Sequence, residues 1–90
     1  MTIIKQTFTA TIQKDDINSG WTCVLWPESA EFFGTRKPVK VLAEIEGHEF
    51  QTTFMPFGNG AHMLPLKAAV MRAIHKRLGD TVVVELKERL

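Results

Sequence analysis

The strongest structural signal in the sequence is the run Val39-Lys-Val-Leu-Ala-Glu-Ile-Glu-Gly-His-Glu-Phe-Gln-Thr-Thr-Phe-Met55. Every second side chain from Val39 to Ile45 is apolar, and those between them are mostly charged. This period of two is typical of a strand with one buried face. Glu46-Gly47 then suits a tight turn, because glycine readily adopts positive φ. The run therefore predicts an antiparallel hairpin whose return strand extends from about Glu49 to Met55.

Shorter patterns on either side of this hairpin predict further strands. Apolar side chains at the even positions from Ile4 to Ile12 indicate a strand with one mostly apolar face. Trp21 to Trp26 is apolar on both faces except at Thr22, which predicts a central strand. An early proline and a final glycine predict a short helix over residues 27–34. The remaining expectations are a turn over residues 14–20, an irregular stretch over residues 56–62 and a final strand over residues 81–87.

The clearest helical pattern covers residues 65–78. At 100° per residue its apolar side chains share one face, and its basic side chains lie opposite or in the last turn, where cations complement the helix dipole. Leu64 is the expected N-cap residue, and Gly79 is the expected first residue beyond the helix. The apolar face consists of Leu66, Val70, Ala73 and Ile74, flanked by Ala69 and Leu78; the basic residues are Arg72, His75, Lys76 and Arg77.

Length and composition limit the class of protein. The chain has 90 residues, of which 44% are hydrophobic and 23% charged, as in an ordinary globular protein. This length predicts one domain over residues 1–90, because a second core would have too few residues to bury. No apolar run approaches the roughly 20 residues of a membrane span. The sequence shows no export signal and has one cysteine, Cys23, so we expect a cytoplasmic protein without a disulfide.

The order of the expected elements is β-β-α-β followed by β-(extended)-α-β. Phe33-Gly34 and Leu78-Gly79 each close a helix before a strand, and they stand 45 positions apart. A pseudo-duplicated small barrel explains this order, but a coincidence of spacing explains it equally, because the two halves share few identical residues. The sequence thus predicts a mainly β protein with two helices (α+β).

Segments spread over nearly the whole chain resemble the bacterial family known as domain of unknown function 1905. They are Trp21 to Pro27, Pro38 to Val41, Ile45 to Gly47 with Phe50, Met55-Pro-Phe-Gly-Asn-Gly-Ala-His-Met-Leu64, Lys67, and Leu78 to Val84. The resemblance implies a double-split β-barrel, or pseudobarrel, capped by helices, as in transition-state regulators of the AbrB type. It implies a bacterial protein and no particular activity, since none is established for the family. Some members also carry a bacteriocin-protection domain, which this sequence lacks.

The glycine-rich segment before the long helix is the candidate ligand site. Glycines allow backbone N–H groups to converge on an anion, and the start of a helix adds unpaired donors and partial positive charge. Leu64 offers no capping oxygen, and Lys67 stands in the first turn, where the dipole disfavours a cation. A bound carboxylate or phosphate would resolve both conflicts; a hydrated loop with Lys67 in solvent is the alternative. The candidate residues are Gly58, Asn59, Gly60, His62 and Lys67, with Trp26 and Arg36 at the wall.

A nucleic-acid interface on the long helix is a second hypothesis. Residues 1–55 carry five basic and seven acidic side chains, for a net charge of −2, whereas residues 56–90 carry six and three, for +3. Arg72, His75, Lys76 and Arg77 concentrate this excess on one helix. The overall charge of only +1 and the absence of a basic arm argue against nucleic acid as the partner.

Enzymatic and metal sites have little support in the sequence. The three histidines, His48, His62 and His75, lack the spacing of a metal site, and no cofactor motif is present. Cys23 and both tryptophans are expected in the core, with Trp26 the better candidate for a pocket. The paired acids Asp15-Asp16 and the group Glu44, Glu46 and Glu49 are expected at the solvated surface. We therefore expect a non-enzymatic module that binds a small anionic ligand or a protein partner; an enzyme of unknown reaction, dependent on His62 or Cys23, stays as a third hypothesis.

Overall fold

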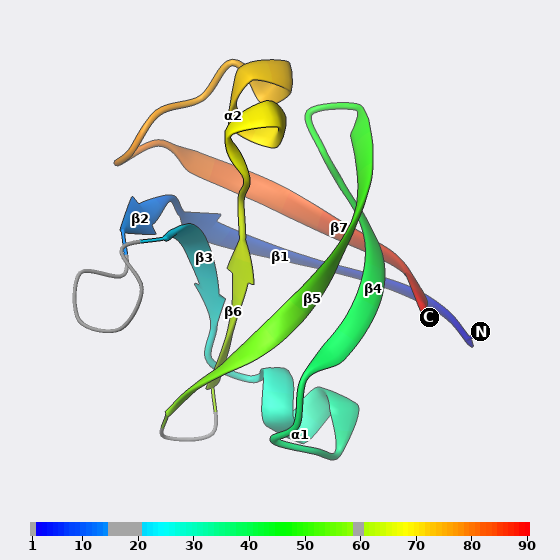
Figure 1. Cartoon of the computed structure of the whole chain (residues 1–90). Helices are drawn as coiled ribbons and strands as arrows, with labels where there is room; N and C mark the ends of the chain where they lie inside the picture. Colours follow the sequence, from blue (N-terminus) through cyan, green and yellow to red (C-terminus); the bar gives the residue numbers. More distant parts are fainter. Residues whose placement is uncertain (1, 15–20, 59–60) are drawn as a thin grey trace.

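A curled antiparallel sheet with one helix at each end forms the protein (Figure 1), as seen in a computed structural model that describes residues 2–14, 21–58 and 61–90. The strand order is β1-β7-β4-β5-β6-β3-β2, and every pairing between neighbours is antiparallel. The elements are β1 (Thr2–Thr11), β2 (Gln13–Lys14), β3 (Thr22–Trp26), α1 (Ser29–Phe33), β4 (Val39–Ile45), β5 (His48–Gly58), β6 (Ala61–Pro65), α2 (Ala68–Ile74) and β7 (Thr81–Arg89). The mainly β architecture with two helices is thus confirmed.

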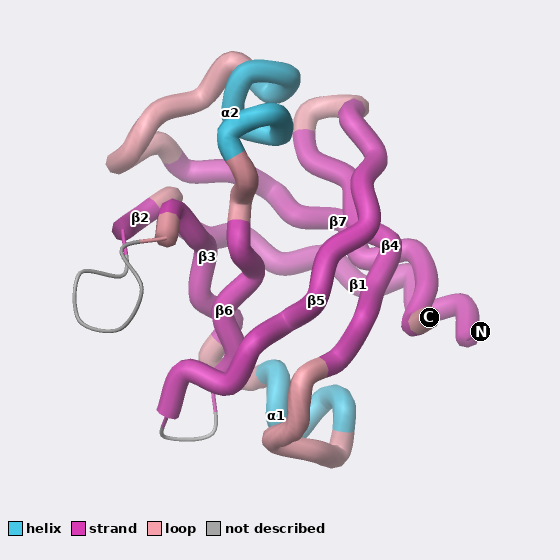
Figure 2. Tube along the Cα trace, viewed as in Figure 1, coloured by secondary structure: helices cyan, strands magenta, loops and turns pink. Residues whose placement is uncertain are grey.

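Two bends turn this sheet into a half-barrel. β5 pairs with β4 over His48–Phe54 and with β6 over Met55–Gly58, so it passes from one part of the sheet to the other (Figure 2). β1 and β2, which end the strand order, are separated only by Ile12. The Ile12 N–H donates to the Asp80 carbonyl (2.8 Å), and the Ile12 carbonyl accepts from the Gly79 N–H (2.8 Å). The curled sheet agrees with the small pseudobarrel that the sequence predicts.

The strand order is compatible with a two-part repeat, one of the two explanations that the sequence leaves open. The first half supplies β1, β3, α1 and β4, and the second supplies β5, β6, α2 and β7. We take β2 as the continuation of β1. Exchanging β1 with β5, β3 with β6 and β4 with β7 then reproduces the same set of neighbouring strands. The topology therefore has the twofold order of a β-β-α-β duplication.

The alternating strands place their apolar side chains in one core, as expected. In β4, Val39, Val41, Ala43 and Ile45 are all buried, whereas Lys40 is exposed. Glu46 (φ 51°) and Gly47 (φ 77°) both have positive φ at the hairpin turn, the geometry that suits right-twisted strands. Aromatic rings fill the core under α1, where Phe54 lies 5.5 Å from Phe33 and 5.9 Å from Trp26 between ring centroids.

The predicted irregular stretch at residues 56–62 is wrong. β5 continues to Gly58, and β6 begins at Ala61, with Met55 opposite Met63 and Pro56 opposite His62. The local sequence, with one proline and two glycines, favours a loop. Pairing between strands outweighs that local preference. Asn59 and Gly60 lie outside the described residues, and so does the turn predicted over residues 14–20, except for Lys14, which belongs to β2.

The long helix is shorter than predicted. α2 covers Ala68–Ile74, with Lys67 in extended conformation (φ −66°, ψ 159°) as its N-cap residue. Leu64 is therefore not the N-cap; it is a buried residue of β6, which ends at Pro65 opposite Cys23. His75 ends the helix in the left-handed region, so Lys76 and Arg77 lie beyond it.

The predicted apolar face is correspondingly reduced. Val70 and Ile74 are its buried residues in α2, whereas Ala73 is exposed and Leu78 is 55% exposed. A helix of seven residues presents only two turns to the sheet, which leaves Ala73 on the outside. None of the described helices is long and apolar enough to span a membrane.

Candidate functional site

A groove of about 610 Å³ opens where the two parts of the sheet diverge. β5 leaves β4 and joins β6 only from Met55 onward, while the far end of β6 follows β3, with Pro65 opposite Cys23. The two strands therefore form a V, and α2 begins at the upper end of β6 (Figure 1). The lining residues are Trp21, Thr22, Lys40, Gln51, Thr52, Thr53, Met55, Pro65, Leu66, Lys67 and Leu90.

An aromatic ring and a cation both line this groove, at the end of the β3–β6 pairing. The Leu66 N–H donates to the Thr22 carbonyl (2.8 Å), which continues the β3–β6 pairing by one residue. Trp21 directly precedes Thr22 and Lys67 directly follows Leu66, and both side chains line the groove. Trp21 is 48% exposed.

A second cation stands across the groove. Lys40 is exposed on the outer face of β4, opposite Thr53 of β5. Among the described residues that line the groove, Lys40 and Lys67 carry the charged side chains, and both are basic. Threonine hydroxyls and the Gln51 amide add hydrogen-bonding groups. This arrangement can bind an anionic group and place an apolar or planar part of the same ligand against Trp21.

The two tryptophans have exchanged the environments that the sequence predicts for them. Trp26, the expected pocket residue, is 6% exposed and stacks on Phe8 with ring centroids 4.8 Å apart. Trp21, expected in the core, lines the groove. The reason is that β3 begins one residue later than expected, at Thr22, which pairs with Lys14 of β2, so Trp21 lies just before the paired part of the strand.

His62 is completely buried and holds α1 to β6. Its Nε2 lies 2.9 Å from the Lys37 carbonyl, which can only accept, so Nε2 carries the proton. In the neutral ring Nδ1 accepts from the Ser29 hydroxyl (2.7 Å), and the Ser29 oxygen accepts from the His62 backbone N–H (2.7 Å). Both side chains are 0% exposed. The pair resembles a nucleophile and its base in distance alone, since no substrate reaches it.

Of the residues predicted for the anion site, the structure places Lys67 in the groove. Gly58 ends β5, Asn59 and Gly60 are outside the described residues, and His62 does not line the groove. Arg36 is exposed between α1 and β4, away from the lining residues. The residues that sequence reasoning missed are Trp21, Lys40 and the β5 segment Gln51–Thr53; alternation marks Lys40 as exposed, but no sequence signal shows where β5 and β6 separate.

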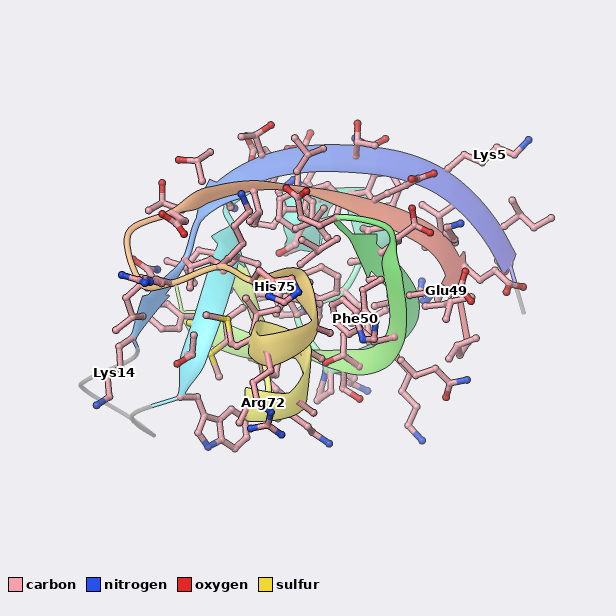
Figure 3. All side chains as sticks on the ribbon, turned by 90° about the horizontal axis from the view of Figure 1, so that it is seen from above. Lys5, Lys14, Glu49, Phe50, Arg72 and His75 are labelled. Atoms are coloured by element: carbon pink, nitrogen blue, oxygen red, sulfur yellow. The ribbon has the colours of Figure 1, made fainter. Side chains whose placement is uncertain are left out.

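The basic residues of the nucleic-acid hypothesis do come together. Arg72, His75, Lys76 and Arg77 surround a shallow hollow of about 590 Å³ with Met71. Figure 3 shows Arg72 and His75 on α2, seen from above. Lys76 lies 3.6 Å from Glu46, so part of this charge is already neutralised. The backbone N–H of Arg77 donates to the Asp80 carboxylate (2.9 Å).

The acidic residues of the hairpin form a surface ion-pair network. Lys87 lies 3.1 Å from Glu44 and 3.5 Å from Glu49. The Glu44 carboxylate, by hydrogen bond and charge, raises the pKa of Lys87 above its usual range, with a smaller effect of Glu49. Cys23 is 0% exposed. No group of three His, Cys, Asp or Glu residues in the described part of the chain could hold a metal ion.

A protein family matches most of the chain. The family described as "Domain of unknown function (DUF1905)" matches residues 8–86, which is most of the chain and includes every described residue of the groove except Leu90. A comparison with curated proteins finds no match.

Proposed function

Because the chain belongs to the DUF1905 family, whose description assigns no activity, we propose a function from the groove itself: the domain is a non-enzymatic module that binds an anionic ligand between the diverging strands. The observation that supports this proposal is the pairing of Lys40 and Lys67 with the half-exposed Trp21 in a groove without an acidic side chain among its described residues.

The size and chemistry of the groove suit a ligand rather than structural water alone. Its volume of about 610 Å³ falls within the roughly 300–1,000 Å³ that is usual for ligand sites. A hydrogen bond to a charged group contributes about 1.5–3 kcal/mol. Two lysines together would therefore contribute about 3–6 kcal/mol of gross interaction energy, part of which offsets the entropy lost on association.

The burial of the reactive side chains supports a binding role over a catalytic one. His62, Ser29 and Cys23 are all 0% exposed, and both ring nitrogens of His62 already have protein partners. The described lining of the groove contains no His, Cys, Asp or Glu side chain. These are the groups that most often transfer protons or act as nucleophiles near neutral pH.

We expect pyrophosphate to bind the native protein and the double variant Lys40→Glu/Lys67→Glu to bind it at least tenfold more weakly, because both cations are replaced by charges that repel it. Tryptophan fluorescence at constant ionic strength measures this binding. The matched control is Lys5→Glu/Lys37→Glu, which changes the net charge equally at two exposed residues outside the groove. Equal weakening in both double variants would contradict the proposal, because only overall charge would then matter.

The hollow on α2 gives less support to a nucleic-acid interface. α2 has seven residues and its last basic neighbours follow in a turn, so it offers no long helix to a groove of DNA. The ion pair between Lys76 and Glu46 further reduces the charge available for phosphate contacts. We therefore place the binding function in the groove.

A further inference from the structure

One edge of β5 has a free segment beside the groove. β4 pairs with β5 over His48–Phe54, and β6 pairs with it only from Met55 onward. Among the residues that the structure describes, no strand pairs with the second edge of β5 at Gln51–Thr53. These three residues are the β5 residues that line the groove together with Met55.

Strand geometry directs backbone groups of this segment into the groove. In an antiparallel sheet, the N–H and C=O of successive residues point to opposite edges of the strand. At least one residue of Gln51–Thr53 must therefore direct both groups away from β4, toward the space between β5 and β6. An unpaired donor and acceptor on an open edge form a template for another extended chain.

The groups around this edge specify the chemistry of that chain. Lys40 and Lys67 lie on either side of the free segment, and the described lining offers no carboxylate side chain to balance them. Trp21, 48% exposed, provides a flat apolar surface beside Lys67. An extended peptide with acidic side chains on one face and apolar side chains on the other would satisfy the backbone edge, the lysines and the ring together.

We propose that the groove receives an extended acidic peptide segment of a partner protein, which adds as a strand to the edge of β5 at Gln51–Thr53. This inference rests on the proposed anion-binding role of the groove and names its partner. It requires main-chain hydrogen bonds as well as charge, which separates it from binding of a small anion.

The test uses three blocked hexapeptides and NMR of the ¹⁵N-labelled full chain. The first alternates valine and glutamate, the second has the same sequence with N-methyl groups on every second residue, and the third replaces glutamate by lysine. We expect the first peptide to shift the amide signals of Gln51–Thr53 and to bind at least tenfold more tightly than either other peptide, because each of those lacks one of the two required interactions. Lys40→Glu/Lys67→Glu should weaken the first peptide at least tenfold, and Lys5→Glu/Lys37→Glu should leave it within twofold.

The outcomes separate this inference from the proposal beneath it. Equal binding of the methylated and unmethylated acidic peptides would overturn strand addition while leaving the anion-binding groove in place. Binding of adenosine monophosphate in preference to the acidic peptide, with the same dependence on Lys40 and Lys67, would assign the groove to small ligands instead. If Lys40→Glu/Lys67→Glu bound the peptides and pyrophosphate as tightly as the native protein does, both strand addition and the anion-binding groove would be overturned.

Discussion

Replacing Phe54 with alanine is expected to lower the free energy of unfolding by about 4 kcal/mol, the usual cost of removing a fully buried phenylalanine ring. Phe54 is 0% exposed and its ring lies 5.5–6.2 Å from those of Phe8, Trp26, Phe33 and His62. It is also the last β5 residue paired with β4, immediately before β5 joins β6. Its loss therefore leaves a cavity at the point where the two parts of the sheet meet.

Urea denaturation followed by circular dichroism measures this change. Phe32→Ala is the matched control, since Phe32 is 43% exposed at the rim of the same aromatic cluster and should cost about 1 kcal/mol. If Phe54→Ala were no more destabilising than Phe32→Ala, Phe54 would not be the centre of the core described above.

The second large effect is expected at His62. His62→Ala should lower the free energy of unfolding by about 3 kcal/mol, because it removes a buried ring and leaves the Ser29 hydroxyl and the Lys37 carbonyl without their partner. Ser29→Ala should cost about 1.5 kcal/mol, since it leaves Nδ1 and the backbone N–H of His62 unpaired. The double variant should cost less than the sum of the two, because both single changes disrupt one network.

His48→Ala is the control for this series. His48 is partly exposed on the hairpin, where its ring stacks on that of Phe50 in the same strand with centroids 6.1 Å apart. Because both rings are only partly buried, its loss should cost less than about 1 kcal/mol. Additive effects of Ser29→Ala and His62→Ala, measured by the same denaturation, would contradict a shared network.

Much of the fold could be predicted because several strands keep strict alternation. β4 and β7 bury every second side chain at their starts, and the period of two marks both in the sequence. α1 was also predictable, since Gly34 ends it at φ 70°, the conformation that glycine adopts without strain. These elements follow from local patterns that agree with their tertiary environment.

β6 and the ends of α2 could not be predicted in the same way. His62, Met63 and Leu64 are consecutive buried residues, so β6 shows no alternation between its two faces. Pro65 suits the start of a helix, but pairing with Cys23 keeps it in the strand and delays α2 to Ala68. In both cases the deciding partner is a strand about 40 residues earlier in the chain.

Of the residues predicted for the candidate site, Lys67 lines the groove, but not for the reason given from the sequence. Lys67 was expected in the first turn of the helix beside a glycine loop, whereas it is the N-cap residue of α2 and lines the groove together with Trp21. The groove itself exists because β5 and β6 diverge, and divergence depends on pairing between strands rather than on any local pattern. Alternation could show that Lys40 is exposed but not that it shares a groove with Lys67.

The central claim is that the anionic ligand lies between Lys40 and Lys67, and mapping of pyrophosphate by ¹H–¹⁵N NMR tests it most directly. The groove predicts that the largest shifts fall on the Trp21 indole N–H and on the amides of Lys67 and Thr53, the residues that line it. Shifts confined to Arg72, His75, Lys76 and Arg77, around the separate hollow on α2, would place anion binding there and contradict the account.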